Sequence, residues 1–192
     1  MLYRMFYLLV LAVVCSLSAA QAGEHVNQEG FSLTYPAAWK SASKKELDKI
    51  SEETKKITGS DPGFLVFIFG APSDGFAPNI NVIAVKDRIP LNSLAEDKTV
   101  KEIKDGFAAL DVPVPEIKTS HIHIGAHIVF SIIYEWDDPA SKRTLQNWAV
   151  MFPSKNGGCI MTCTALKSQW GEAGTVFKSV INNLKFDGVL AK

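Results

Sequence analysis

Three of the four histidines in the chain lie close together, at His121, His123 and His127. On a β-strand, His121 and His123 would project from the same face, about 6–7 Å apart. Two imidazoles at that separation can share a divalent metal ion when a third ligand joins them. Such residues are more often polar side chains on the less buried face of a strand, so both interpretations stay open.

The turn that follows decides whether His127 can be the third ligand. A two-residue turn at Gly125-Ala126 would pair Ile124 with His127 and would place His127 on the face opposite the other two histidines. A loop longer or shorter by one residue would bring all three histidines to one face.

Cysteines offer a second kind of chemistry, because a thiolate can attack a substrate or close a disulfide. Cys159 and Cys163 lie in one apolar run. On a single strand their Cα atoms would be about 13 Å apart, and a disulfide needs less than about 7 Å. Met161 and Ala165 would share their face, which favours free thiols in the core over a nucleophile beside a base.

No motif that carries catalysis occurs in the chain. Glycine-rich nucleotide loops, the Gly-x-Ser-x-Gly elbow and the His-Glu-x-x-His helix are all absent. Glu135, Asp137 and Asp138 cluster at a turn, but a calcium loop needs more oxygen ligands at regular spacing. We therefore predict a protein that is not an enzyme and has no cofactor, apart from the divalent metal considered for the histidines.

Two aromatic side chains lie where a partner protein could contact them. Phe76 belongs to residues 70–78, a segment rich in Gly, Ala, Ser and Pro that predicts a long loop, and Trp170 follows the last predicted strand. Exposed aromatic rings mark interfaces, whereas half-buried rings only cover the end of a core. The second interpretation is favoured for both rings.

The composition excludes several classes of protein. Lys+Arg and Asp+Glu number 20 each in 192 residues, so the chain lacks the basic excess of a general nucleic-acid binder. It is 47% hydrophobic, which is too apolar for a disordered chain. This length supports one domain with its own core, and the sequence contains no internal repeat.

The N-terminal residues predict an export signal. A short start with Arg4 precedes an apolar run, and Ala20 and Ala22 supply small residues two apart. This pattern is typical of a secretory signal peptide, residues 1–22, cleaved from a mature domain at 23–192. We expect a periplasmic or secreted protein with no stable membrane insertion after cleavage, and an uncleaved anchor is the alternative.

The hydrophobic pattern predicts strands joined by tight turns, with three helices among them. Residues 64–69 are apolar throughout, as expected of a central strand covered on both faces. The order of the segments implies an α+β fold with an antiparallel sheet. Strands are predicted at 31–35, 64–69, 79–85, 116–124, 127–136, 144–152 and 159–165, and helices at 43–56, from 92 or 93 through Leu110, and near 172–184.

Several of these segments, in this order, resemble the PsbP-like family. The family includes the lumenal accessory protein of photosystem II, exported bacterial proteins of the PsbP and DcrB types, and a Ran-binding nuclear protein. The resemblance covers nearly all of the mature chain. The matching pieces are residues 31–36 with Trp39, residues 79–82, the hairpin from Ile124 to Tyr134, and residues 159–165 before a helix that ends at 181–186.

The resemblance implies a central antiparallel β-sheet of about six to seven strands flanked by helices, an α/β/α sandwich. It implies a non-catalytic role and carries over no catalytic residue, because the fold hosts unrelated functions. We therefore expect an exported accessory protein that assists or binds an envelope protein complex, with Phe76 and Trp170 as candidate partner contacts. The alternative is a small-ligand or metal-binding module that uses His121 and His123.

Overall fold

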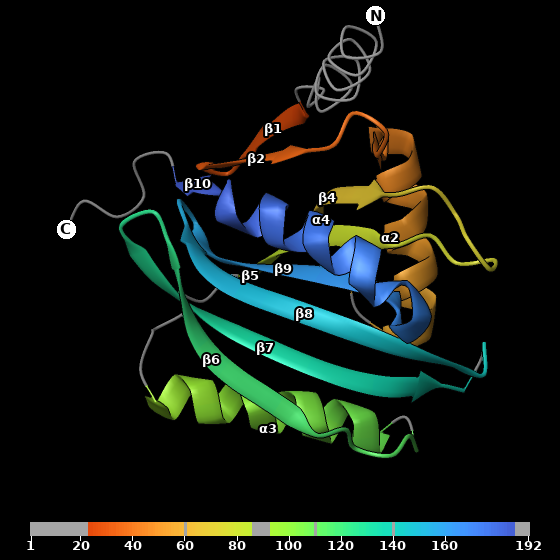
Figure 1. The fold of residues 1–192 in the computed structure, drawn as a ribbon. Helices are drawn as coiled ribbons and strands as arrows, with labels where there is room; N and C mark the ends of the chain where they lie inside the picture. Colours follow the sequence, from red (N-terminus) through yellow and green to blue (C-terminus); the bar gives the residue numbers. More distant parts are fainter. Residues whose placement is uncertain (1–22, 60, 86–92, 110, 140, 187–192) are drawn as a thin grey trace, which may run out of the picture.

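The computed structural model describes residues 23–59, 61–85, 93–109, 111–139 and 141–186, so the predicted leader lies outside the described residues. The largest element is a seven-stranded antiparallel sheet in the order β3-β4-β5-β9-β8-β7-β6 (Figure 1). This confirms the predicted α+β class with a central antiparallel sheet. The strands are β3 (Lys40–Ser41), β4 (Phe64–Phe69), β5 (Asn79–Val85), β6 (Ile117–Ile124), β7 (His127–Asp138), β8 (Arg143–Ser154) and β9 (Gly157–Leu166).

A second, three-stranded sheet lies apart from the large one. It places β2 (Phe31–Tyr35) between β1 (Glu24–Gln28) and β10 (Lys185–Phe186). The sequence predicts β2 but not its two partners, because β1 is mostly polar and β10 has only two residues. The sequence does not predict β3 in the large sheet either, because this strand also has only two residues.

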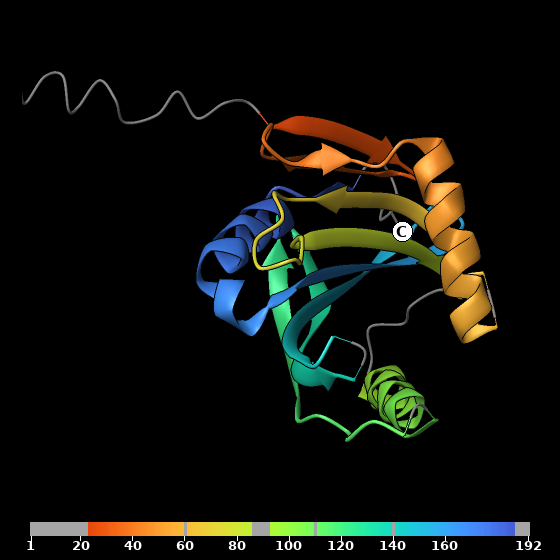
Figure 2. The same ribbon diagram turned by 90° about the vertical axis from the view of Figure 1, so that its right-hand side faces the viewer.

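Helices cover both faces of the large sheet (Figure 2). The helix α4 (Trp170–Asn182), which follows the short 3-10 helix η1 (Lys167–Gln169), lies with the small sheet on one face. The helices α2 (Lys44–Thr58) and α3 (Ser93–Ala109) lie on the opposite face. The result is the predicted sandwich, with the small sheet as an addition.

The main core lies between the large sheet, α4 and β2. Phe31 packs edge-on against Phe152, with ring centroids 5.3 Å apart. Alternate residues of β9 point into this core, and Cys159 and Cys163 are both 0% exposed. Both thiols are free, as their spacing predicts. Burial raises the pKa of Cys159 to about 11, and it raises the pKa of Cys163 as well.

A smaller core lies beneath α3. Val100 and Ile103 of this helix pack against buried residues of β7 and β8, and Phe107 packs edge-on against Tyr134 with centroids 5.7 Å apart. These three residues form the inward face of the helix, and Leu110, where the predicted helix ends, lies outside the described residues. The buried partners on the sheet are Phe130, Ile132, Ala149 and Met151.

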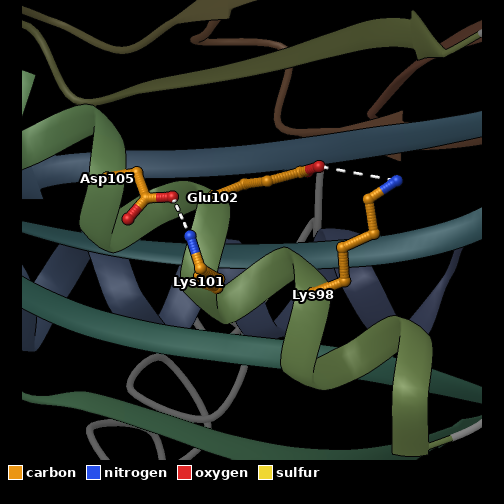
Figure 3. A network of polar contacts seen from close by, with 4 residues as sticks. All are labelled: Lys98, Lys101, Glu102 and Asp105. Atoms are coloured by element: carbon orange, nitrogen blue, oxygen red, sulfur yellow. Dashed lines mark hydrogen bonds and ion pairs between the residues drawn. The ribbon is translucent and has the colours of Figure 1, made fainter.

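The outward face of α3 carries two ion pairs at a spacing of four residues. The Nζ of Lys98 lies 3.7 Å from Oε1 of Glu102, and the Nζ of Lys101 lies 2.5 Å from Oδ2 of Asp105 (Figure 3). All four side chains are largely exposed, so water screens both pairs and each adds little to the stability of the helix. The apolar face beneath the helix holds it in place.

The strand β4 departs from its prediction as a central strand covered on both faces. Only Val66 and Ile68 are buried, whereas Phe67 and Phe69 are partly exposed. The reason is its position in the sheet, because its outer neighbour β3 is only two residues long. The continuous apolar run of β4 therefore lies next to the edge of the sheet, and the face that bears Phe67 and Phe69 is partly exposed.

A capping box begins α2. The Glu46 carboxylate accepts a hydrogen bond from the backbone N–H of Ser43 at 2.8 Å, and the Ser43 hydroxyl oxygen accepts one from the backbone N–H of Glu46 at 3.4 Å. The hydrogen bonds from Ser43 hold the pKa of Glu46 below its usual range. The helix ends at Gly59, whose φ of 78° is left-handed.

Replacing the cap with Ser43→Ala should lower the free energy of unfolding by about 1 kcal/mol, because an N–H group at the helix start loses its partner. Urea unfolding followed by circular dichroism measures this change. Ser51→Ala in the same helix removes no cap and raises helix propensity. Equal destabilisation by both variants would show that the capping box does not stabilise α2.

The two core cysteines should resist thiol reagents until the protein unfolds, because both are buried and their raised pKa values leave little thiolate at neutral pH. In denaturant, a thiol assay on the protein lacking residues 1–22 should count two free thiols per chain. Rapid labelling of the folded protein near pH 7 would contradict this burial.

Candidate functional site

A cleft of about 430 Å3 lies on the α4 side of the large sheet. We call it the end cleft, because it lies where the 70–78 loop leaves β4 and meets the start of α4. Three separate parts of the chain form its walls. They are the turn after β2 (Ala38, Trp39), the loop (Gly70, Ala71, Ser73, Asp74, Pro78) and the segment around the start of α4 (Ser168, Gln169, Gly171, Glu172, Ala173, Val176).

The loop wall is held by its own backbone. Gly70 donates a hydrogen bond from its N–H to the carbonyl of Pro78 at 2.8 Å, which closes the base of the loop. Ser73 and Phe76 exchange two backbone hydrogen bonds of 3.0 Å at the tip. Asp74 and Gly75 between them adopt left-handed φ angles of 52° and 72°, as a tight turn requires.

Gln169 ties this loop to the start of α4. Its Nε2 donates to the carbonyl of Ser73 at 2.8 Å and to that of Phe76 at 3.3 Å. Its Oε1 accepts from the backbone N–H of Leu166 at 3.3 Å. One side chain therefore joins the loop, the end of β9 and the helix.

A second hollow of about 410 Å3 adjoins the first one and shares Asp74 and Ser168 with it. Its floor includes Arg143 at the start of β8, whose Nη1 donates to the carbonyl oxygen of Asp74. Arg143 thus holds the loop at Asp74, and Gln169 holds the carbonyls of Ser73 and Phe76. Beside it, Lys167 lies 2.6 Å from the carboxylate of Glu135.

The end cleft is acidic beside an apolar wall. Asp74 and Glu172 are the charged residues that line it, and both are exposed. Neither carboxylate forms an ion pair with another described residue. Trp39 and Val176 supply the apolar wall, and both side chains are partly buried in the main core.

The two aromatic rings predicted as partner contacts flank the end cleft without lining it. Phe76 is half-buried, and its backbone carbonyl accepts from Gln169. Trp170 packs on Phe177 with centroids 5.5 Å apart, and Gly174 lies directly beneath the indole. These positions agree with rings that cover the end of the core, and a partner contact at either stays a prediction.

The three neighbouring histidines do not converge. The β6–β7 turn pairs Ile124 with His127, which places His127 against Phe186 on the face away from His121 and His123. The Nε2 of His121 lies 2.7 Å from a carboxylate oxygen of Glu96 in α3. Across the described ranges, no group of three or more His, Cys, Asp or Glu side chains is placed to hold a metal ion. Metal binding at His121 and His123 stays a prediction that lacks a third ligand.

The acidic turn after β7 is occupied by local hydrogen bonds. Thr144 donates its hydroxyl to Asp137 at 2.6 Å, and the backbone N–H of Ser141 donates to Asp138 at 3.1 Å. Both carboxylates thus accept hydrogen bonds from neighbouring residues of the chain. Within the part of the chain that the structure describes, no helix is long and apolar enough to cross a lipid bilayer.

Sequence reasoning located the 70–78 loop but not the residues that fix it. Gln169 and Arg143 lie far from the loop in sequence, and neither residue type by itself predicts a hydrogen bond to the loop backbone. The Asp74-Gly75 pair is typical of a tight turn and predicts the tip of the loop. Only the fold brings all of these residues together.

Comparison with known proteins gives structural relatives only. No protein-family model matches the sequence, and no curated protein matches it. The solution structure of cyanobacterial PsbP (CyanoP) from Synechocystis sp. PCC 6803 superposes with a TM-score of 0.59 at 14% identity, covering 88% of this chain and 95% of that one. The crystal structure of LpqN from Mycobacterium tuberculosis, described as involved in cell envelope biogenesis, gives a TM-score of 0.51 at 12% identity, covering 88% and 87%. At these identities the likeness concerns the fold alone, and the chain therefore has the PsbP-like fold that the order of its segments predicts.

Proposed function

We propose that the protein is an exported, non-catalytic accessory protein that binds a subunit of a cell-envelope complex through the end cleft. The observation that carries the proposal is the loop wall, which Gln169 and Arg143 hold in place without a partner. A surface that is already ordered loses little conformational entropy when it binds. Preformed hollows of this size are where proteins hold ligands and partner side chains.

The chemistry of the end cleft suits binding better than catalysis. Ser73 and Ser168 are its hydroxyl groups, and no histidine among the described side chains lines it to act as their base. The cysteine thiols lie in the core with raised pKa values, so they are poor nucleophiles. The carboxylates of Asp74 and Glu172 are exposed, where they are suited to attract charge.

The proposed location rests on two observations. Residues 1–22 have the pattern of a cleaved export signal. One protein of the same fold, LpqN, is described as involved in cell envelope biogenesis. Both support an extracytoplasmic protein that works at the envelope.

The charges of the end cleft favour a basic segment of the partner. Asp74 and Glu172 attract a Lys or Arg side chain, and the aromatic ring of Trp39, in the third wall of the cleft, adds a cation–π contact for it. The small side chains of Ala38 and Ala71 leave room for an extended backbone. Complementary charge of this kind raises both association rate and specificity.

A photo-crosslinking amino acid at Ala71, in the wall of the end cleft, tests the proposal in the native cell envelope. We expect one dominant crosslinked partner, attached through a peptide that contains Lys or Arg and identified by mass spectrometry. The charge reversals Asp74→Lys and Glu172→Lys together should weaken binding of that purified partner at least tenfold, which corresponds to about 1.4 kcal/mol.

The matched control is Asp48→Lys with Glu52→Lys, which reverses two exposed charges on α2 on the opposite side of the sheet. This control should leave the affinity within about twofold. Equal loss in both double variants would indicate general charge attraction, and the absence of any crosslinked protein would reject the accessory role.

A further inference from the structure

The face of the large sheet away from α4 carries a repeated arrangement of aromatic, amide and hydroxyl side chains. In the first row, Phe69 of β4 pairs with Asn79 of β5, which pairs with Thr164 of β9. The second row lies two residues further along each strand. It contains, in the same order, Phe67, Asn81 and Thr162. Directly paired residues of antiparallel strands share a face and lie about 5 Å apart, so the six side chains form a grid.

The grid lies on the face that bears α2 and α3 (Figure 2). All six residues are partly exposed. Both rows continue under α3, where Asn147 and Ala149 are buried. The grid therefore begins beside α3 and extends across β9 and β5 to β4, the strand that α2 contacts.

Some polar side chains of the grid form hydrogen bonds within the protein, and others do not. Thr164 donates its hydroxyl to Oδ1 of Asn147 at 2.7 Å, and Nδ2 of Asn79 donates to the carbonyl of Ala77 at 3.2 Å. The side chains of Asn81 and Thr162 form no hydrogen bond with any other described residue. An amide and a hydroxyl group, each able to donate and to accept, are thus available in the second row.

We propose that this grid, which we call the Phe–Asn–Thr face, is a binding site for a neutral polyhydroxylated ligand, a saccharide chain. The hydroxyl groups of a sugar both donate and accept, as the Asn and Thr side chains do. The apolar faces of sugar rings pack on aromatic rings, which Phe67 and Phe69 provide beside each Asn. Two equivalent rows, about 7 Å apart along the strands, offer the same kinds of contact to two parts of one saccharide chain.

Other ligand classes fit this face less well. None of its six residues is charged, so it offers neither the cations that hold an anion nor the carboxylates that hold a metal ion. The nearest charge in the register is Lys40, which is exposed beyond Phe69 at the edge of the sheet. An acyl chain would leave the amides of Asn79 and Asn81 without water, which costs about 1–3 kcal/mol for each polar group.

The Phe–Asn–Thr face is separate from the end cleft, which lies on the α4 side of the same sheet. Its test is therefore independent of the proposed partner. The mature protein, labelled with 15N, is titrated with maltotetraose, cellotetraose and chitotetraose, each to about 10 mM, a range that detects millimolar affinity. We expect at least one of these to shift the amide signals of Asn81 and Thr162 and their paired neighbours on β4.

The double variant Asn81→Leu/Thr162→Val keeps the shape of both side chains and strengthens strand propensity, while removing the free hydrogen-bonding groups. It should weaken binding of that oligosaccharide at least tenfold. The matched control Asn182→Leu/Thr34→Val makes the same chemical changes at α4 and β2 and should bind as the unmodified protein does. Shifts with none of the three sugars, shifts located elsewhere, or equal loss in both double variants would overturn the proposal, and the signals of the unmodified protein decide it even if a variant fails to fold.

Discussion

The burial of Phe177 between the two sheets is the contact on which the fold and the end cleft both depend. Its ring is 0% exposed and packs edge-on against Trp39 at 5.8 Å and at a tilt against Trp170 at 5.5 Å. Phe177 and Trp170 both belong to α4, whereas Trp39 belongs to the turn after β2, so the contact between Phe177 and Trp39 fixes the helix against the small sheet. A buried phenylalanine of this kind contributes about 3–5 kcal/mol, a large share of the stability of a domain.

The same contact determines the shape of the end cleft. Trp39 lines the cleft, and Gly70 begins the 70–78 loop directly against its indole, where an added Cβ would lie 3.0 Å from the ring. Glycine at this position lets the loop leave β4 along the Trp39 wall. Gln169, the residue directly before α4, then joins the loop tip to the start of this helix. The cleft is therefore a consequence of core packing, and no ligand is needed to form it.

Local patterns in the sequence predicted nearly all of the large sheet, because alternation and tight turns are encoded by neighbouring residues. They could not predict β3 or β10, whose two residues pair only because the tertiary fold brings them to an edge. The site shows the same division. Turn chemistry marked the 70–78 loop, whereas Gln169 holds it across more than ninety positions of sequence, and the Phe–Asn–Thr rows exist only once the register of β4, β5 and β9 is known.

The end cleft and the Phe–Asn–Thr face meet at one point of the chain. Pro78 lines the cleft, and the next residue, Asn79, opens the first row on the opposite face. The Asn79 amide also donates to the carbonyl of Ala77, inside the loop that forms the cleft wall. A sugar that draws the Asn79 amide away from Ala77 would loosen this loop, whereas one that binds Asn81 and Thr162 would leave it intact. Any such effect must be mutual, because a ligand that changes the affinity for a partner is itself bound more or less tightly by the same factor when the partner is present.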